Sequence, residues 1–430
     1  MKKVMTLTLV SLLAVPMMAA TPTARPEEVG FSAERLQRVH DLVQRHIDAR
    51  SFSGAVTLIA RNGRVAHFEA QGLMDIDSKK PMQKDGIFRI MSMTKPVVGV
   101  ALMMMIEEGK VRLTDPISRF IPSFKDLQVG VALPAAPGGG RGAAAAPAGA
   151  ATPAPAARFY TVPAEREITI RDLLTHTSGL MSGTVSNESG RGFAAGPTDK
   201  LADYIPRLGK TALEFQPGTR WAYSAAAGFD VLARIVELTS GLPFDQFAKQ
   251  RIFDPLGMKD TTFQPQESNP RIVTLYQRTP EGQLRKQANP AFVNGVYFSG
   301  GGGLMSTPED YLQFALMLVN GGQLNGKRLL APRTVEMMGT VAAPDTLPGR
   351  AKGEGYGLSM RVVNDPMARN TFLSEGSFGW SGAYGTHFWV DRKEKMVAIV
   401  MTQTSNREFL GDFENLVMQA LVGSTSAGTN

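Results

Sequence analysis

The amino-acid sequence predicts a mixed α/β fold whose sheet is completed by strands from both ends of the chain. Two β-rich runs near the N-terminus are separated by Asn62-Gly63, a dipeptide typical of hairpin turns. Two further β-rich runs lie near the C-terminus, at residues 385–390 and 396–401. Between these pairs, several segments carry apolar residues at helical spacing. The chain of 430 residues has no internal repeat and is long enough for two or three average domains or one large two-lobed enzyme.

The N-terminal part of the chain is expected to begin with a helix, followed by the hairpin and a second helix. Residues 32–49 have apolar side chains on one side of the first helix. These side chains belong to Leu36, Val39, Leu42 and Ile47. The β-rich runs of the hairpin are 54–60 and 64–70. The second helix is expected to run from near Ser92 to Gly109, because glycine often ends a helix.

A segment of unusual composition interrupts this pattern at residues 131–157. It consists almost entirely of Ala, Gly and Pro, so few of its side chains could bury apolar area. We therefore expect a flexible insertion on the surface. A lid over a substrate cleft is the alternative, since long loops of compact enzymes are often functional.

The clearest helix start in the second half of the chain lies at Thr307. Thr307 is a good N-cap, Pro308 suits the first helical position, and Asp310 stands where a capping box places a carboxylate. This helix is expected to end at residues 320–322, which read Asn-Gly-Gly. Two more helices are expected at residues 224–238 and 407–421.

The first twenty residues have the pattern of a secretory signal peptide. Lys2 and Lys3 precede an apolar run at residues 4–15, and small residues close the segment before cleavage after Ala20. The apolar run is too short to span a bilayer easily, which makes an uncleaved membrane anchor the weaker alternative. Cleavage would lower the formal charge from +7 to +5. We expect a periplasmic or secreted protein with no stable membrane span after signal cleavage.

Composition excludes several classes of function. Hydrophobic residues make up 43% and charged residues 20%, as in globular proteins with a sizeable core. The basic residues are scattered, whereas a nucleic-acid interface needs them clustered. The chain has no cysteine, so it has no disulfide, thiol nucleophile or lipid-attachment cysteine.

Several chemical motifs are missing. No G-x-S-x-G nucleophile elbow occurs. No histidines are paired at metal-ligand spacing, so no metal is expected. The five histidines are His40, His46, His67, His176 and His387. Glycines 300–303 lack the Lys-Ser/Thr of a phosphate loop, and we interpret them as a site of close backbone packing; no cofactor is expected.

The run Ser92-Met93-Thr94-Lys95 carries the best candidate chemistry. Residues three apart share a helix face, so the Ser92 hydroxyl and the Lys95 amine can lie within hydrogen-bond reach. Pro96 fits a position near the helix start, where the helix dipole favours a developing anion on Ser92. A buried lysine with a lowered pKa can activate a serine hydroxyl. Taken alone, S-x-x-K is too common to distinguish this role from that of a solvated helix start.

Further segments make the sequence resemble the serine β-lactamase-like hydrolases over nearly the whole mature chain. The similarity is to class C β-lactamases and, more closely, to their esterase relatives, the family VIII carboxylesterases. The similar segments, in order, are Phe88 to Pro96, Leu113 to Pro116, Arg171 to Leu180, Pro217 to Ser224, Pro255 to Met258 and Gly302 to Thr307. The similarity lapses at the Ala/Pro/Gly-rich insertion.

The resemblance implies a role for each matching residue. Ser92 corresponds to the acylated serine, and Lys95 with Tyr223 to its general base. A phenol can act as a base only when a nearby cation stabilises its phenolate, and Lys95 would be that cation. The third motif falls at Trp380-Ser381-Gly382. The backbone N–H groups of Ser92 and Ala383 would form the oxyanion hole.

Two departures from the β-lactamase pattern bear on the substrate. Tyr223-Ser224-Ala225 replaces Tyr-x-Asn, so the amide that would hold a lactam is missing. Trp380 replaces the lysine of Lys-Thr-Gly, so the cation that would bind a substrate carboxylate is missing as well. Both changes favour neutral acyl esters. The alternative for Trp380 is a core aromatic.

The resemblance also implies a domain division and a minor role for His176. An α/β domain would comprise residues 21–115 and 290–430, with an antiparallel sheet flanked by helices. A mostly helical domain would comprise residues 116–289 and contain the insertion. His176 falls in a turn of the helical lobe, and we expect it to be structural because no orienting carboxylate is evident for it.

The expected function is hydrolysis of short-chain acyl esters through an acyl-enzyme, with a small-molecule ester as the partner. A β-lactamase, D-alanyl carboxypeptidase or aminopeptidase on the same fold is the first alternative. A catalytically silent envelope binding protein is the second. The sequence does not define the oligomeric state, the natural substrate or the acyl-chain preference.

Overall fold

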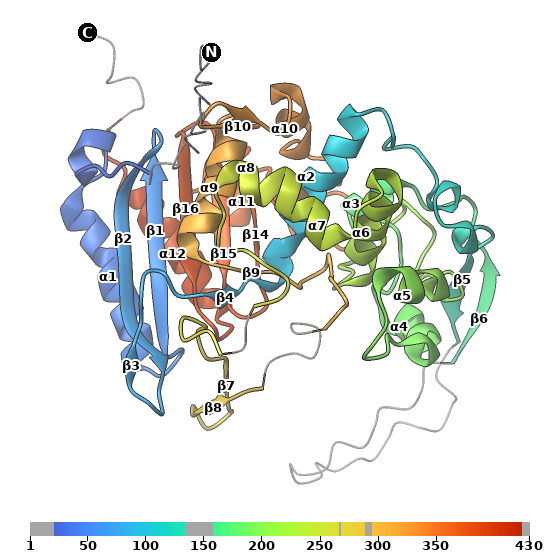
Figure 1. The fold of residues 1–430 in the computed structure, drawn as a ribbon, viewed down its shortest axis with the longest axis horizontal. Coiled ribbons are helices and arrows are strands. Elements are labelled where there is room, and N and C mark those ends of the chain that lie inside the picture. Colours follow the sequence, from blue (N-terminus) through green and yellow to red (C-terminus); the bar gives the residue numbers. More distant parts are fainter. Residues whose placement is uncertain (1–20, 134–157, 266–267, 289–294, 424–430) are drawn as a thin grey trace, which may run out of the picture.

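The computed structural model describes residues 21–133, 158–265, 268–288 and 295–423 (Figure 1). Its centre is an eight-stranded sheet in the order β12-β13-β14-β15-β16-β1-β2-β3, in which all neighbours are antiparallel. The strands are β1 (Gly54–Arg61), β2 (Arg64–Asp75), β3 (Lys80–Pro81), β12 (Glu354–Tyr356), β13 (Arg361–Val363), β14 (Phe378–Ser381), β15 (His387–Asp391) and β16 (Met396–Met401). The sheet therefore joins strands from both ends of the chain, which confirms the predicted fold class.

The junction between the two ends of the chain is the pairing of β1 with β16. Their register runs from Val56 opposite Met401 to Arg61 opposite Met396. Every residue of both strands is buried, because helices cover both faces of the sheet at this point. The hairpin predicted around Asn62-Gly63 is formed by β1 and β2.

Two helices from opposite ends of the chain cover one face of the sheet (Figure 1). They are α1 (Ala33–Asp48) and α12 (Arg407–Gln419), and their apolar residues form one core cluster with Ile59, Trp389 and Val400. Leu36, Val39 and Leu42 are buried as predicted, and Ile47 is half-buried. The opposite face packs on α2 (Thr94–Glu107) and α9 (Pro308–Val319) in a second, larger cluster.

A mostly helical region lies beside the sheet (Figure 1). Its helices are α3 (Ile170–Leu174), α4 (Thr184–Gly190), α5 (Leu201–Leu208), α6 (Ala227–Ser240), α7 (Phe244–Ala248) and α8 (Asp254–Leu256). α6 packs against α2, which connects this region to the sheet. The predicted helix at 224–238 thus begins three residues later than expected. The domain boundaries themselves stay a prediction.

Short strand pairs and helices complete the described elements. The pairs are β4 (Phe88–Arg89) with β9 (Met305–Ser306), β5 (Gln128–Ala132) with β6 (Phe159–Pro163), β7 (Tyr276–Arg278) with β8 (Leu284–Lys286), and β10 (Gln323–Leu324) with β11 (Lys327–Arg328). The helices are α10 (Pro332–Met338) and α11 (Pro366–Arg369).

Two predicted segments fall partly or wholly outside the described residues. The predicted start of the insertion, at residue 131, is too early. Val131 and Ala132 belong to β5 and pair with β6. Residues 134–157 lie outside the described part, as does the predicted signal peptide at 1–20. Within the described ranges, no helix has both the length and the apolar character needed to cross a bilayer.

The start of α9 confirms one part of a prediction and corrects another. The Thr307 side chain accepts a hydrogen bond from the N–H of Asp310 (3.2 Å), as an N-cap should. The Asp310 carboxylate does not complete a capping box. It accepts instead from the N–H of Asp260 (2.7 Å) and from Thr261 Oγ1 (2.9 Å), because the chain after α8 packs against this helix start.

The Thr307 cap can be tested by paired substitutions. Thr307→Ala should lower the free energy of unfolding by about 1 kcal/mol more than Thr307→Ser, because serine keeps the capping oxygen. Urea denaturation of the two variants measures the difference. Equal stabilities would mean that the cap contributes nothing and that only the lost methyl group matters.

Candidate active site

Ser92 lies in a tight turn between β4 and α2. The turn is a 3₁₀ segment, Met91–Met93, and α2 begins at Thr94. The predicted helix thus starts two residues after Ser92. Met91 has φ +48°, a left-handed conformation that costs energy for a residue with a side chain. Strain of this kind persists only where surrounding structure fixes the backbone, and it is common at functional sites.

Neighbouring segments hold the turn from two sides. The N–H of Ile90 donates to the carbonyl of Leu304 (3.1 Å), and Thr386 Oγ1 donates to the carbonyl of Ile90 (3.1 Å). A Cβ on Gly382 would clash with that same carbonyl, so only glycine allows this approach. The Ser92 turn is therefore fixed both by the segment that follows the glycine run, before β9, and by the third motif at the end of β14.

Lys95 is fully buried at the first turn of α2. Its Nζ donates to Ser92 Oγ (3.2 Å) and to the carbonyls of Ala225 (2.6 Å) and Gly301 (2.6 Å). These three acceptors match the three protons of an ammonium group. Burial lowers the pKa of Lys95, while Tyr223 and Asp230 act in the opposite direction.

Tyr223 completes the contacts to the serine oxygen. Its hydroxyl donates to Ser92 Oγ (2.7 Å), and the Lys95 Nζ lies 5.0 Å from the centre of its ring. The structure therefore brings together the three residues that the sequence identified, although Tyr223 follows Ser92 by 131 positions. Such an arrangement can move a proton from the serine to a nearby base.

The third motif lies at the end of β14, beside the Ser92 turn. Gly382 donates its N–H to the carbonyl of Thr386 (2.7 Å), which closes a turn that exposes Ala383. Among the described residues, the N–H groups of Ser92 and Ala383 have no hydrogen-bond acceptor. Two unengaged donors flanking a serine are what an oxyanion hole requires. Their role as an oxyanion hole stays a prediction.

Trp380 forms an aromatic wall beside Tyr223. Its half-buried ring lies 5.7 Å from the Tyr223 ring and 5.1 Å from the Tyr356 ring, measured between ring centres. The Arg350 guanidinium stacks over Trp221, 4.4 Å from its centre, at the far side of this cluster. Trp380 thus belongs to a packed aromatic cluster and also borders the site, so the two interpretations of its role do not exclude each other.

His176 lies behind Tyr223 rather than beside Ser92. Its Nδ1 accepts from the N–H of Ser224 (3.2 Å), and its ring centre lies 4.8 Å from that of Tyr223. Burial, together with the charges of Lys95 and Arg350, holds the pKa of His176 well below its usual range. A neutral histidine that packs against Tyr223 fits the structural role expected for it.

Ser381 contacts a charged network that no sequence pattern predicted. Ser381 Oγ lies 2.8 Å from His387 Nδ1, and His387 Nε2 lies 3.0 Å from Glu414 Oε1 on α12. Glu414 also pairs with Arg361 and Arg369. These cations and His387 hold the pKa of Glu414 far below its usual range, so the carboxylate is charged. No spacing in the sequence indicates this network, because it forms across separate strands and a helix.

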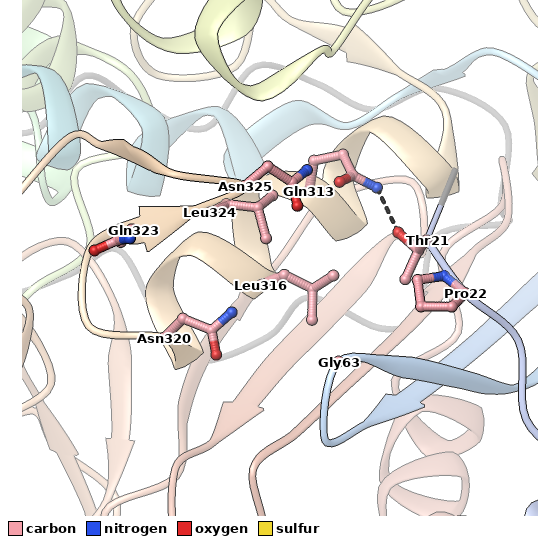
Figure 2. A pocket seen from close by; sticks show the side chains of 9 residues that line it. All are labelled: Thr21, Pro22, Gly63, Gln313, Leu316, Asn320, Gln323, Leu324 and Asn325. Carbon is pink, nitrogen blue, oxygen red and sulfur yellow. Dashed lines mark hydrogen bonds between the residues drawn. The ribbon is translucent and has the colours of Figure 1, made fainter. Parts of the chain in front are cut away.

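Other parts of the described chain offer less chemistry. No cluster of three metal-ligating side chains occurs in the described ranges. A pocket beside the first described residues is lined by uncharged residues of three segments: Thr21 and Pro22, Gly63 of the β1–β2 turn, and residues from α9 to the turn after β10 (Figure 2). In it Gln313 donates to Thr21 Oγ1 (2.8 Å), and no nucleophile, acid or base faces the space.

Comparisons with known proteins identify the family and the fold of the chain. The model of the family described as "Beta-lactamase" matches residues 39–421. "Protein Rv1367c" of Mycobacterium tuberculosis is 36% identical over 371 residues, which cover 83% of this chain and 87% of that protein. "Esterase EstB" of Burkholderia gladioli is 29% identical over 408 residues, which cover 89% of this chain and 93% of that protein. The solved structure of "EstCE1, a hydrolase with promiscuous acyltransferase activity" superposes with a TM-score of 0.72 at 25% identity, over 90% of this chain and 98% of that one.

The histidine of the charged network should make stability depend on pH. Burial lowers the pKa of His387 below 6.5, so between the two values only the unfolded chain takes up a proton there. The contribution of neutral His387 to the free energy of unfolding should therefore be fully present above pH 6.5 and be lost as the pH drops below this value. Each such histidine contributes up to about 1.4 kcal/mol per pH unit.

His387→Gln provides the test, because glutamine can still hydrogen-bond to Ser381 but does not titrate. Chemical denaturation between pH 7.5 and 5 should show a shallower loss of stability in this variant than in the wild type. If the free energy of unfolding of His387→Gln depends on pH as steeply as that of the wild type, the lowered pKa assigned to His387 is wrong.

Proposed function

Because the chain belongs to the beta-lactamase family and is a serine hydrolase of that fold, we propose that it is a carboxylesterase that acts through an acyl-enzyme at Ser92. The observation that carries this proposal is the pair of hydrogen bonds to Ser92 Oγ, from Lys95 at 3.2 Å and from Tyr223 at 2.7 Å. Both potential bases touch the atom that must lose its proton.

In the proposed acylation step, the Lys95–Tyr223 pair removes the proton of Ser92 as its oxygen attacks the ester carbonyl. The negative charge that develops on the carbonyl oxygen is stabilised by the N–H groups of Ser92 and Ala383. Two preorganised donors of this kind contribute several kcal/mol to acyl-transfer transition states. The pair then returns the proton to the departing alcohol, leaving the acyl group on Ser92.

In deacylation the same pair takes a proton from a water molecule, which attacks the acyl-enzyme and releases the acid. We assign this step to Tyr223, because its hydroxyl reaches Ser92 Oγ and its ring packs against His176 and Trp380. The phenolate of Tyr223, restored when the departing alcohol took its proton, would accept the proton of the water, and the buried Lys95 ammonium would stabilise this phenolate beforehand.

The residues around the pair support a neutral substrate. Ala225 has only a methyl side chain where a lactam-binding amide would stand, and its carbonyl is engaged by Lys95. Trp380 presents an aromatic ring in place of a cation. "Esterase EstB" and "EstCE1" are named as an esterase and a hydrolase, respectively, which supports an ester as the substrate. That its acyl chain is short is part of the proposal.

Transfer of the acyl group to an alcohol instead of water is a second candidate. It is favoured by the similarity to EstCE1, whose description includes promiscuous acyltransferase activity. The two activities share the acyl-enzyme and differ only in the second nucleophile. We also propose export to the periplasm or the medium, on the strength of the N-terminal pattern at residues 1–20.

Substrate preference provides the first test. The protein should hydrolyse p-nitrophenyl butyrate and should turn over nitrocefin poorly, because the groups that would bind a lactam are replaced. Ser92→Ala should lower ester hydrolysis by at least about 10³-fold and abolish labelling by a fluorophosphonate. Fast nitrocefin turnover with negligible ester cleavage would favour the β-lactamase alternative. Absence of both turnover and labelling would favour a silent binding protein.

The base provides the second test. Lys95→Ala and Tyr223→Phe should each lower kcat by about 10² to 10⁴-fold, the usual contribution of a general base. Tyr160→Phe, on the exposed strand β6, is the matched control and should leave kcat unchanged. Thermal unfolding should show that all variants are folded. Turnover close to that of the wild type in either site variant would exclude that residue from the proposed role.

A further inference from the structure

Asp230 is a fully buried carboxylate on α6 that touches neither Ser92 nor Lys95. It accepts three hydrogen bonds, from Tyr297 Oη (2.7 Å), Ser299 Oγ (2.8 Å) and the N–H of Gly301 (2.9 Å). All three donors belong to the short segment that precedes β9. One side chain of α6 therefore fastens this segment to the helical region.

Gly301 connects this carboxylate to the catalytic lysine. Its N–H donates to Asp230, and its carbonyl accepts from Lys95 Nζ (2.6 Å). Asp230 thus fixes one of the three acceptors that hold the ammonium. The second carbonyl acceptor is Ala225, two residues before α6 begins. Residues at the N-terminal end of α6 therefore position both carbonyls.

The packing leaves these carbonyls little freedom. A Cβ on Gly301 would lie 2.5 Å from the Cα of Ala226, and a Cβ on Gly300 would lie 2.5 Å from the carbonyl oxygen of Phe229. The glycine run is therefore a site of close backbone packing, as predicted. Because the two backbones are in direct contact, a shift of the segment would move the Lys95 acceptor with it.

Charge provides a second connection between the two residues. The titratable groups that face Lys95 are Tyr223, Asp230 and His176, and Asp230 is the carboxylate among them. Tyr297, Tyr204 and Lys95 are the groups that face Asp230. Burial raises the pKa of Asp230, while the hydrogen bonds from Tyr297, Gly301 and Ser299 and the charge of Lys95 act in the opposite direction. In its ionised form, which these three donors stabilise, Asp230 opposes the loss of the Lys95 proton through the intervening Gly301.

We propose that Asp230 is a positioning residue of the catalytic site, which fixes the Gly301 carbonyl against Lys95 and supplies the negative charge that balances its ammonium. The role rests on the proposed function of Lys95 as part of the base. It also explains why a lysine with its whole side chain buried can remain in one place with every proton engaged.

The test is the pH dependence of kcat/KM for p-nitrophenyl butyrate in Asp230→Asn. Asparagine keeps the size of the side chain and can still accept from Ser299 and Gly301, but it has no charge. We expect kcat/KM at its optimum to fall between about 10- and 100-fold, as for a small misplacement of a catalytic group. The acid limb should move to lower pH by on the order of one unit, because the Lys95–Tyr223 pair then reaches its proton-accepting form more easily without the nearby negative charge.

Asp310→Asn is the matched control. Asp310 is also a buried aspartate that accepts from a backbone N–H and a hydroxyl, but it lies at the start of α9 and makes no contact with Lys95 among the described residues. Its acid limb should match that of the wild type. If Asp230→Asn does not fold, Asp230→Ser is the second variant and should show the same shift.

The outcomes separate this inference from the proposed function. Lower activity in Asp230→Asn with an unshifted acid limb would make Asp230 a structural residue only and overturn the inference. Unchanged activity and an unchanged limb would overturn it as well. Retention of esterase activity in Ser92→Ala would refute the proposed function itself, whatever Asp230→Asn shows.

Discussion

The hydrogen bonds that hold the Lys95 ammonium are the constraint on which the site depends. Taking a charged amine out of water is unfavourable unless its protons are engaged, and here Ser92 and two backbone carbonyls engage them. The lysine therefore has no freedom to turn away from the serine. Lys95 comes from α2, whereas the two carbonyls come from the start of α6 and the segment before β9. The site exists only when all three are packed together.

The architecture of the sheet explains how such distant segments meet. Pairing of β1 with β16 closes the sheet between the two ends of the chain, and α2 and α9 pack on the face that also supports β14. The end of β14 then meets the Ser92 turn at the Ile90 carbonyl, where Gly382 and Thr386 both approach it. On the other face, Glu414 of α12 is joined to Ser381 through His387. The C-terminal helix is thus connected to the third motif although it lies across the sheet from Tyr223.

Much of the fold could be predicted because it depends on local patterns. The spacing of Leu36, Val39 and Leu42 predicted α1, and Asn62-Gly63 predicted the hairpin. The serine and lysine were predictable as neighbours because residues three apart share a face of a helical turn, although Ser92 lies in the 3₁₀ turn that precedes α2 and not in the helix itself. Tyr223 was assigned only through the resemblance to a family, since no local pattern places it beside Ser92.

The remaining interactions could not be read from local patterns, for physical reasons. The acceptors of Lys95 at Ala225 and Gly301 are backbone carbonyls, which every residue has, so side-chain identity does not reveal them. The glycine run was the one indication, and it indicated close packing without naming the partner helix. Asp310 shows the converse error: its spacing from Thr307 suits a capping box, but tertiary contacts with Asp260 and Thr261 prevail.

One aromatic cluster connects Tyr223 with Trp380. The Tyr223 ring packs against both His176 and Trp380, so Trp380 helps to set the position of the phenol. Trp380 also contacts Tyr356, and the Arg350 guanidinium stacks over the Tyr356 ring. Under the proposed function, a substitution at Trp380 would change both the surface offered to the ester and the packing that orients the Tyr223 hydroxyl toward Ser92. Substrate preference and catalytic rate would then change together, because both depend on the same aromatic cluster.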